Sequence, residues 1–161
     1  PGGAPRRRAR RRLAGETVAM LVTRDASGVP IVRPVQPVRI EDGRLWIFTA
    51  LDGDIAREVQ RAADVHVVFA NQQRELFVSL NGAARLMLDP RKARELWSPL
   101  AGAWYPAGPD DTNLALLRID VHRGDYWDMK DAKLVRFFKL AAAAMMGATP
   151  DDVATHRRFE Q

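Results

Sequence analysis

Residues 30–49 read PIVRPVQPVRIEDGRLWIFT and contain the clearest strand pattern of the chain. Valine, isoleucine and aromatic residues dominate both of its halves, which is typical of β-strands. The Glu-Asp-Gly run between the halves suits a tight turn, so the pattern predicts antiparallel strands over 30–40 and 44–49. Pro34 and Pro37 each lack a backbone N–H, which restricts the first strand to an edge or a bulge of the sheet.

The same β-rich pattern recurs on both sides of this stretch, at residues 17–23, 64–70, 75–88, 113–122 and 124–129. Gly82 predicts a bulge or bend in the longest of these strands. Helical spacing covers residues 54–63, with Ile55 and Val59 on one side and Glu58 elsewhere, and Asp89-Pro90 starts a second helix. Short antiparallel strands with few helices predict a mostly β fold, a small β-barrel with peripheral helices.

The length of 161 residues predicts one domain. We assign residues 1–15 to a basic N-terminal helix or arm, 16–130 to the barrel, and 131–161 to C-terminal helices of the same domain. No apolar run approaches the ~20 residues that a membrane span needs. The chain has no cysteine, so we expect a reducing compartment and a cytoplasmic location.

The positive charge is concentrated at the N-terminus. Six arginines lie between Arg6 and Arg12, and the formal charge of +5 becomes −1 without them. A basic arm of this kind can bind nucleic acid by counterion release. We favour a solvated amphipathic helix instead, because the rest of the chain has no basic excess.

The sequence offers no catalytic motif. It has no nucleophile elbow and no phosphate loop, and its three histidines, at positions 66, 122 and 156, stand far apart without the spacing of metal ligands. We therefore expect no metal site and assign no catalytic acid or base.

Four segments carry a resemblance to a known family: Val32-Arg33-Pro34-Val35, Leu45 to Thr49, Trp104-Tyr105-Pro106 and Asp125 to Asp128. In this order, together with the Trp-Tyr-Pro-x-Gly-x-Asp-Asp run that starts at Trp104, they resemble the general stress protein branch of the pyridoxamine 5'-phosphate oxidase-like family. The resemblance extends from about Leu13 to Asp128. It implies a split β-barrel of the FMN-binding type and a homodimer that holds one FMN at each of two sites in the subunit interface.

The resemblance also implies which residues contact the cofactor: Arg33, Pro34, Val35, Gln36, Phe48, Thr49, Gly53, Asp54, Ile55 and Trp127. The Arg33 guanidinium is suited to a bidentate phosphate contact, and the Thr49 hydroxyl can add a hydrogen bond. The backbone around Val35 and Gln36 can contact the edge of the isoalloxazine ring, and Trp127 can pack against the flavin. A surface strand position for Arg33 and a core position for Trp127 are the alternatives.

The loop after the Phe-x-Thr strand departs from the family. Its members usually place a serine and, two residues later, a lysine there for the phosphate, whereas this chain has Gly53 and Ile55 with Asp54 between them. Losing these contacts is expected to cost about 1–3 kcal/mol, or about one to two decades of FMN affinity. Glycine amides and the N-terminus of the helix near Asp54 can compensate in part.

Two functions therefore stay open. The first is an FMN-binding protein with a flavin-dependent redox role, an oxidoreductase of unknown substrate; the second is a flavin-free homodimeric module that binds or supports another molecule. Oxidation of pyridoxamine phosphate itself ranks below simple flavin binding, because the Arg-x-His substrate signature is missing after Trp127.

Overall fold

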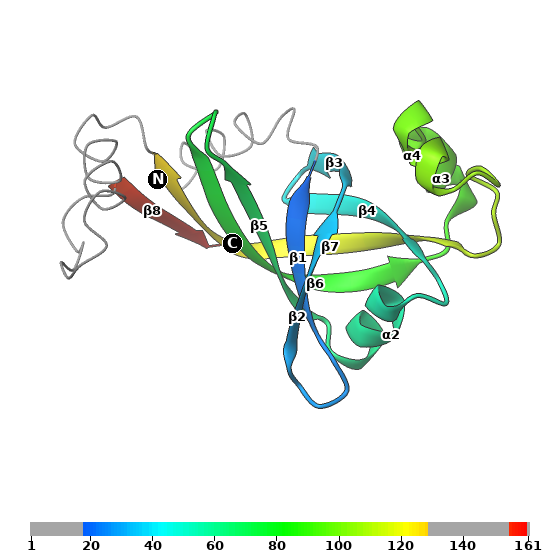
Figure 1. Cartoon of the computed structure of the whole chain (residues 1–161), viewed down its shortest axis with the longest axis horizontal. Coiled ribbons are helices and arrows are strands. Elements are labelled where there is room, and N and C mark those ends of the chain that lie inside the picture. The colour runs from blue at the N-terminus through cyan, green and yellow to red at the C-terminus, as the bar shows by residue number, and fades with distance from the viewer. Residues whose placement is uncertain (1–17, 129–154, 161) are drawn as a thin grey trace.

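The computed structural model describes residues 18–128 and 155–160. Its elements are β1 (Ala19–Arg24), β2 (Pro30–Val35), β3 (Pro37–Glu41), β4 (Arg44–Ala50), α2 (Asp54–Arg61), β5 (Asp64–Asn71), β6 (Leu76–Met87), α3 (Pro90–Leu96), α4 (Pro99–Trp104), β7 (Leu114–Asp128) and β8 (Thr155–Glu160). The strands form one sheet in the order β2-β1-β5-β6-β7-β4-β3, and β8 pairs with β7. The pairs that link neighbouring strands are antiparallel. This curled sheet with few helices confirms the predicted split barrel (Figure 1).

The proline-rich stretch forms two strands rather than the single strand that we predicted. β2 pairs with β1 and β3 pairs with β4, with Gln36 between them. The two strands lie at opposite edges of the sheet order. The predicted edge position is therefore confirmed for both halves. Because β2 and β3 take different partners, the chain has to leave one edge of the curled sheet and enter the other at Gln36.

Gly82 produces the predicted bulge. The register between β6 and β7 shifts between Asn81 and Gly82. A Cβ atom at Gly82 would lie 2.5 Å from the Asp120 carbonyl oxygen and 2.9 Å from the side chain of Ile119. The two backbones thus approach more closely than any residue with a side chain allows.

Strand β4 is buried on both faces, and this position organises the core. Leu45 and Ile47 belong to the main cluster inside the curl, with Val67, Val78 and Leu117. Trp46 and Phe48 point the other way, into a second cluster with Ala93 and Leu96 of α3 and Ala101 of α4. The alternation of strand side chains assigns successive residues to the two faces, and α3 and α4 cover the outer face beside β4 (Figure 1).

Local capping explains where the helices begin. The Asp89 carboxylate accepts a hydrogen bond from the Lys92 N–H at 3.0 Å, which confirms the predicted helix start before Pro90. The Ser98 hydroxyl accepts one from the Ala101 N–H at 3.2 Å and caps α4. We did not predict this short helix from the sequence.

Two expectations at the C-terminal end are corrected. Residues 114–128 form one long strand instead of two, because both halves pair continuously with β6 across the bulge. Residues 155–160 form a strand, where we expected part of a helix, because they pair with the 123–128 end of β7. Such edge pairing overrides local helical preference. The predicted basic arm at 1–15 and the helices at 131–154 lie outside the described residues.

Within the described part of the chain, no helix is long and apolar enough to cross a membrane.

Candidate ligand-binding site

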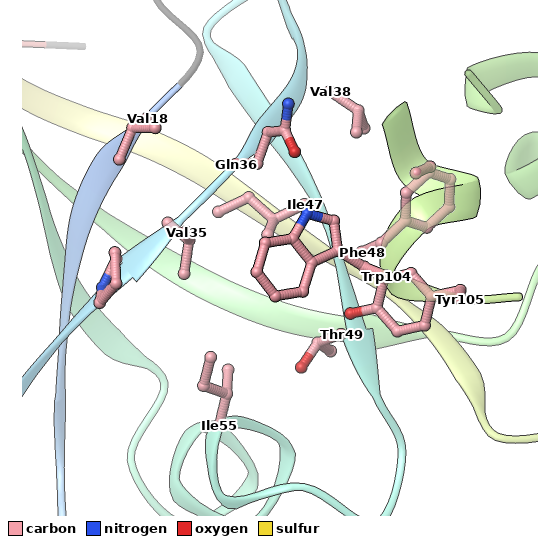
Figure 2. Close-up of a pocket in the computed structure, with 12 residues that line it drawn as sticks. Val18, Val35, Gln36, Val38, Ile47, Phe48, Thr49, Ile55, Trp104 and Tyr105 are labelled. Carbon is pink, nitrogen blue, oxygen red and sulfur yellow. The ribbon is translucent and has the colours of Figure 1, made fainter. Parts of the chain in front are cut away.

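A cavity of about 350 Å³ opens where the β2–β3 junction, β4, α2 and α4 meet (Figure 2). Its lining residues are Val18, Pro34, Val35, Gln36, Val38, Ile47, Phe48, Thr49, Ile55, Ala101, Trp104 and Tyr105. In Figure 2, Ile55 and Val38 lie at opposite ends of this lining. Cavities that bind small molecules or cofactors are usually of this size, apolar, and equipped with a few polar groups.

Aromatic side chains form one part of the wall. The Phe48 ring meets Trp97 edge to face, with centroids 5.5 Å apart, and Tyr105 at 6.2 Å. These contacts fix Phe48 between β4 and the α3–α4 segment. Trp104 is 74% exposed, so a large aromatic surface at the cavity remains available to pack against a flat ligand.

The polar side-chain atoms of the wall come from Gln36, Thr49, Trp104 and Tyr105 (Figure 2). Thr49 is buried, at 5% exposure. Burial raises the pKa of the Tyr105 phenol above its ordinary value of 10, so this group stays protonated at neutral pH and can donate a hydrogen bond. The side chains of the wall therefore offer an amide, two hydroxyls, an indole N–H and no ionised group to a ligand.

Six of the ten residues that the resemblance implies do line this cavity: Pro34, Val35, Gln36, Phe48, Thr49 and Ile55. They come from the β2–β3 junction, β4 and α2, which are separated in sequence and meet in the fold. Arg33, Gly53, Asp54 and Trp127 are not among the lining residues.

Arg33 is held by a carboxylate of α2. Its Nη1 and Nη2 atoms donate to the two oxygens of Glu58 at 2.6 and 2.7 Å. The Thr23 hydroxyl donates to Glu58 at 2.5 Å and accepts from Arg33 at 2.8 Å. Glu58 is 7% exposed. The pair is therefore bidentate, largely shielded from water, and formally neutral.

The ion pair stabilises both ionised forms. Hydrogen bonding from Arg33 holds the pKa of the Glu58 carboxyl below its ordinary value, against the opposing effect of burial. The Glu58 hydrogen bond correspondingly raises the pKa of Arg33. Helical spacing assigned Glu58 to the polar side of its helix, away from Ile55 and Val59. That assignment missed the contact, because a buried charge with a partner cannot be told from a solvated one by spacing.

Gly53 and Asp54 lie at the N-terminus of α2, directly before the lining residue Ile55. Gly53 is the N-cap residue and makes no side-chain cap. The Asp54 carboxylate accepts a hydrogen bond from Nη2 of Arg57 at 2.5 Å, in a largely exposed ion pair. The loop thus presents a carboxylate and an apolar side chain beside the cavity, and neither is a phosphate ligand.

Trp127 lies at the other end of the sheet. It stands opposite Phe77 of β6 and His156 of β8, whereas Thr49 at the cavity stands opposite Ala115. The twelve residues that separate positions 115 and 127 of β7 span about 40 Å measured along the strand. Trp127 is not among the residues that line the cavity within one chain.

The sequence interpretation missed six lining residues: Val18, Val38, Ile47, Ala101, Trp104 and Tyr105. A signal existed for the last three, because they lie in a long connection rich in aromatic residues, and such connections are usually functional. Val18, Val38 and Ile47 carry no signal beyond strand-like apolarity. In the ranges 18–128 and 155–160, no cluster of His, Asp or Glu has the arrangement of a metal site.

The fold and the site together define a class, that of split-barrel proteins with a small-molecule cavity beside the fourth strand. The sequence model of the family described as "Pyridoxamine 5'-phosphate oxidase like" matches residues 6–151. The chain belongs to this family. The comparison with curated proteins found no match.

Solved structures agree with this assignment. The general stress FMN/FAD binding protein from Xanthomonas citri is 29% identical, with a TM-score of 0.67, and the match covers 78% of this chain and 89% of that one. A protein designated general stress protein 26 from Jannaschia sp. CCS1 is 23% identical with a TM-score of 0.71, over 98% of this chain and 99% of its own. A pyridoxamine 5'-phosphate oxidase-related, FMN binding protein from Nostoc punctiforme is 18% identical with a TM-score of 0.59, over 82% and 86%. The last two matches support the fold alone.

Proposed function

We propose that this protein binds a flavin, with FMN as the family's expected form, and acts in a flavin-dependent redox role. One observation carries the proposal: six residues implied by the resemblance converge on one apolar, partly aromatic cavity. The relative from Xanthomonas citri is named an FMN/FAD binding protein, which supports a flavin as the ligand. The physiological substrate is left open.

The wall suits the isoalloxazine ring. Phe48 and Tyr105 supply aromatic surface that is already fixed by mutual contact, and Trp104 supplies more at the mouth. The Gln36 amide and the Thr49 hydroxyl would hydrogen-bond polar atoms of the ring system. A flavin supplies hydride or electron transfer when bound, and the protein would bind it, orient it and exclude water from one face.

The phosphate end fits less well. The described residues that line the cavity carry no charge, and Arg33, the expected phosphate ligand, is already paired with Glu58. No step of the proposed function depends on a phosphate contact.

We also propose a homodimer, in which the outer face of the sheet carries the interface. Met20 stands opposite Val68, and Phe77 stands opposite Trp127, so these residues share the face that points away from the main core. Val32 of β2 and Met20 are 54% and 37% exposed. An apolar face of this kind is typical of subunit contacts. In a dimer, Trp127 of one subunit could lie near the other subunit's cavity.

The dimer is tested by light scattering during size-exclusion chromatography. We expect a mass near 36 kDa, twice the 18.0 kDa of one chain. Val32→Asp should produce monomers, because it buries an unpaired carboxylate in the interface. Val29→Asp is the matched control, since Val29 is equally exposed, at 51%, but lies in the β1–β2 turn. A monomeric natural protein would refute the dimer.

The flavin proposal is tested by a visible absorption spectrum of the purified protein and by reconstitution with added FMN. We expect flavin to be retained or taken up with an altered spectrum. Val38→Trp should abolish uptake by filling one end of the cavity, while Val29→Trp, which adds the same side chain far from the cavity, should not. A natural protein that takes up no flavin would contradict the proposal.

The flavin-free module remains the second candidate, and one observation favours it. The ion pair between Arg33 and Glu58 removes the charge that would anchor FMN. If the protein takes up no flavin but the homodimer forms, this alternative replaces the first.

A further inference from the structure

Charge is missing where a phosphorylated ligand would need it. The described residues that line the cavity are apolar or neutral polar, and the side chains in its wall are those of valine, proline, isoleucine, alanine, glutamine, threonine and three aromatic residues. A phosphate dianion loses much of its hydration on entering such a site. Only cations or converging N–H groups that bind the phosphate compensate for this cost in free energy. The wall therefore favours a ligand without ionised groups.

Arg33, the arginine next to the cavity, already forms an ion pair with Glu58. Arg33 precedes the lining residue Pro34, and its side chain reaches Glu58 of α2. Both of its terminal nitrogens donate to Glu58, at 2.6 and 2.7 Å. Moving Arg33 to a phosphate would leave Glu58 ionised, 7% exposed and held only by Thr23. This exchange is unfavourable because breaking a buried ion pair leaves the Glu58 carboxylate buried without a counter-ion.

The N-terminus of α2 does not replace the missing cation. Ile55 lines the cavity at this end and presents carbon where a lysine would present an ammonium group. The neighbouring Asp54 carboxylate is paired with Arg57 at 2.5 Å, so the local formal charge is zero. The amides of the first helical turn remain as weak donors to one end of a ligand.

We propose that the cavity selects an uncharged, flat ring ligand, the class of a flavin without its phosphate, and does not discriminate in favour of the phosphorylated form. This inference rests on the proposed function, because it assumes that the ring of a flavin occupies the cavity. It assigns recognition to Phe48, Trp104, Tyr105, Gln36 and Thr49. Arg33 is thereby a structural residue that joins β2 to α2, and not a ligand-binding one.

The test is a pair of titrations with riboflavin and FMN, followed by quenching of flavin fluorescence. These two ligands share the ring and the ribityl chain and differ only in the phosphate. We expect the dissociation constant of riboflavin to be no more than threefold higher than that of FMN. We also expect the FMN dissociation constant to change less than twofold between low and high salt, because no ion pair with the ligand is formed.

A variant restores the cation as a positive control. Ile55→Lys places an ammonium group at the α2 end of the cavity and should tighten FMN about tenfold, the effect of one charge-assisted hydrogen bond of about 1.4 kcal/mol. The ratio of FMN affinity to riboflavin affinity should therefore rise by about the same factor. Ile55→Met is the matched control, because it supplies a long side chain without charge and should leave the ratio of the two affinities unchanged.

The outcomes separate the inference from the function on which it rests. FMN binding that is more than threefold tighter than riboflavin binding in the natural protein would overturn the inference and leave the flavin proposal standing. If neither ligand binds, both are overturned. An Ile55→Lys variant whose affinity ratio equals that of Ile55→Met would overturn the assignment of the α2 end to the phosphate position.

Discussion

Replacing Glu58 by glutamine tests the ion pair that organises this side of the barrel. Glu58 accepts hydrogen bonds from Arg33 at 2.6 and 2.7 Å and from Thr23 at 2.5 Å. Glutamine has almost the same shape, but one of its oxygens becomes an NH2 group that cannot accept. At least one of the two bonds from Arg33 is therefore lost, and the guanidinium charge is left without its counter-ion.

The expected cost follows from the burial of the pair. Hydrogen bonds to charged groups contribute about 1.5–3 kcal/mol each, and breaking a fully buried ion pair costs about 3–5 kcal/mol. The Arg33 side chain is 26% exposed and that of Glu58 is 10% exposed, so water can solvate Arg33 in part. We expect Glu58→Gln to lower the free energy of unfolding by about 2–3 kcal/mol at neutral pH.

The pH dependence gives a second readout. Because the folded-state pKa of Glu58 lies below its ordinary value of 4.5, the carboxylate stabilises the fold fully above that value, and this contribution is lost as the pH falls through the lower folded-state pKa. The difference between the natural protein and Glu58→Gln should therefore be constant above about pH 6 and shrink in acid below 4.5.

Urea unfolding followed by circular dichroism measures both quantities. Asp54→Asn is the matched control on the same helix, since its ion pair with Arg57 is largely exposed and should contribute under about 0.5 kcal/mol. A change below about 0.5 kcal/mol for Glu58→Gln at neutral pH, with the acid dependence of the natural protein unaltered, would refute the reasoning.

Three further predictions concern the fold and the cavity wall. Gly82→Ala should destabilise the protein by about 1–3 kcal/mol, because its Cβ would lie 2.5 Å from a carbonyl oxygen; in Gly102→Ala the new Cβ meets only a ring carbon at 3.9 Å, so this control should not be destabilised. Asp89→Ala should cost about 1 kcal/mol by removing the cap of α3, and an unchanged urea midpoint would contradict that role. The Tyr105 phenol should titrate above pH 10, seen as absorbance at 295 nm that is missing in Tyr105→Phe; titration at or below the ordinary value would show that the ring is not buried.

Much of the barrel could be predicted because its elements are specified locally. Strands alternate in hydrophobicity, the Glu41-Asp42-Gly43 turn uses positive φ angles at Asp42 and Gly43, and Asp89 caps its helix directly. Such signals act over a few residues, so the sequence contains them in full. Gly82 also belongs here, since a glycine inside a strand usually marks a close approach of two backbones.

The rest depends on contacts between distant segments. Residues 30–40 divide into two edge strands because the first half pairs with β1 and the second half pairs with β4. Strand β8 forms because it pairs with the 123–128 end of β7. The pairing of Arg33 with Glu58 joins residues 25 positions apart. The sequence shows that both residues are charged, but it does not show that they form an ion pair with each other. This ion pair decides whether Arg33 is available to a ligand.

Calorimetric titration of the natural protein with riboflavin measures whether the cavity holds a flavin ring. We expect saturable binding of one equivalent per chain, with a dissociation constant in the micromolar range, about −8 kcal/mol, and loss of the heat signal in Val38→Trp. The absence of saturable binding up to about 100 times that concentration, or equal binding by Val38→Trp, would contradict it.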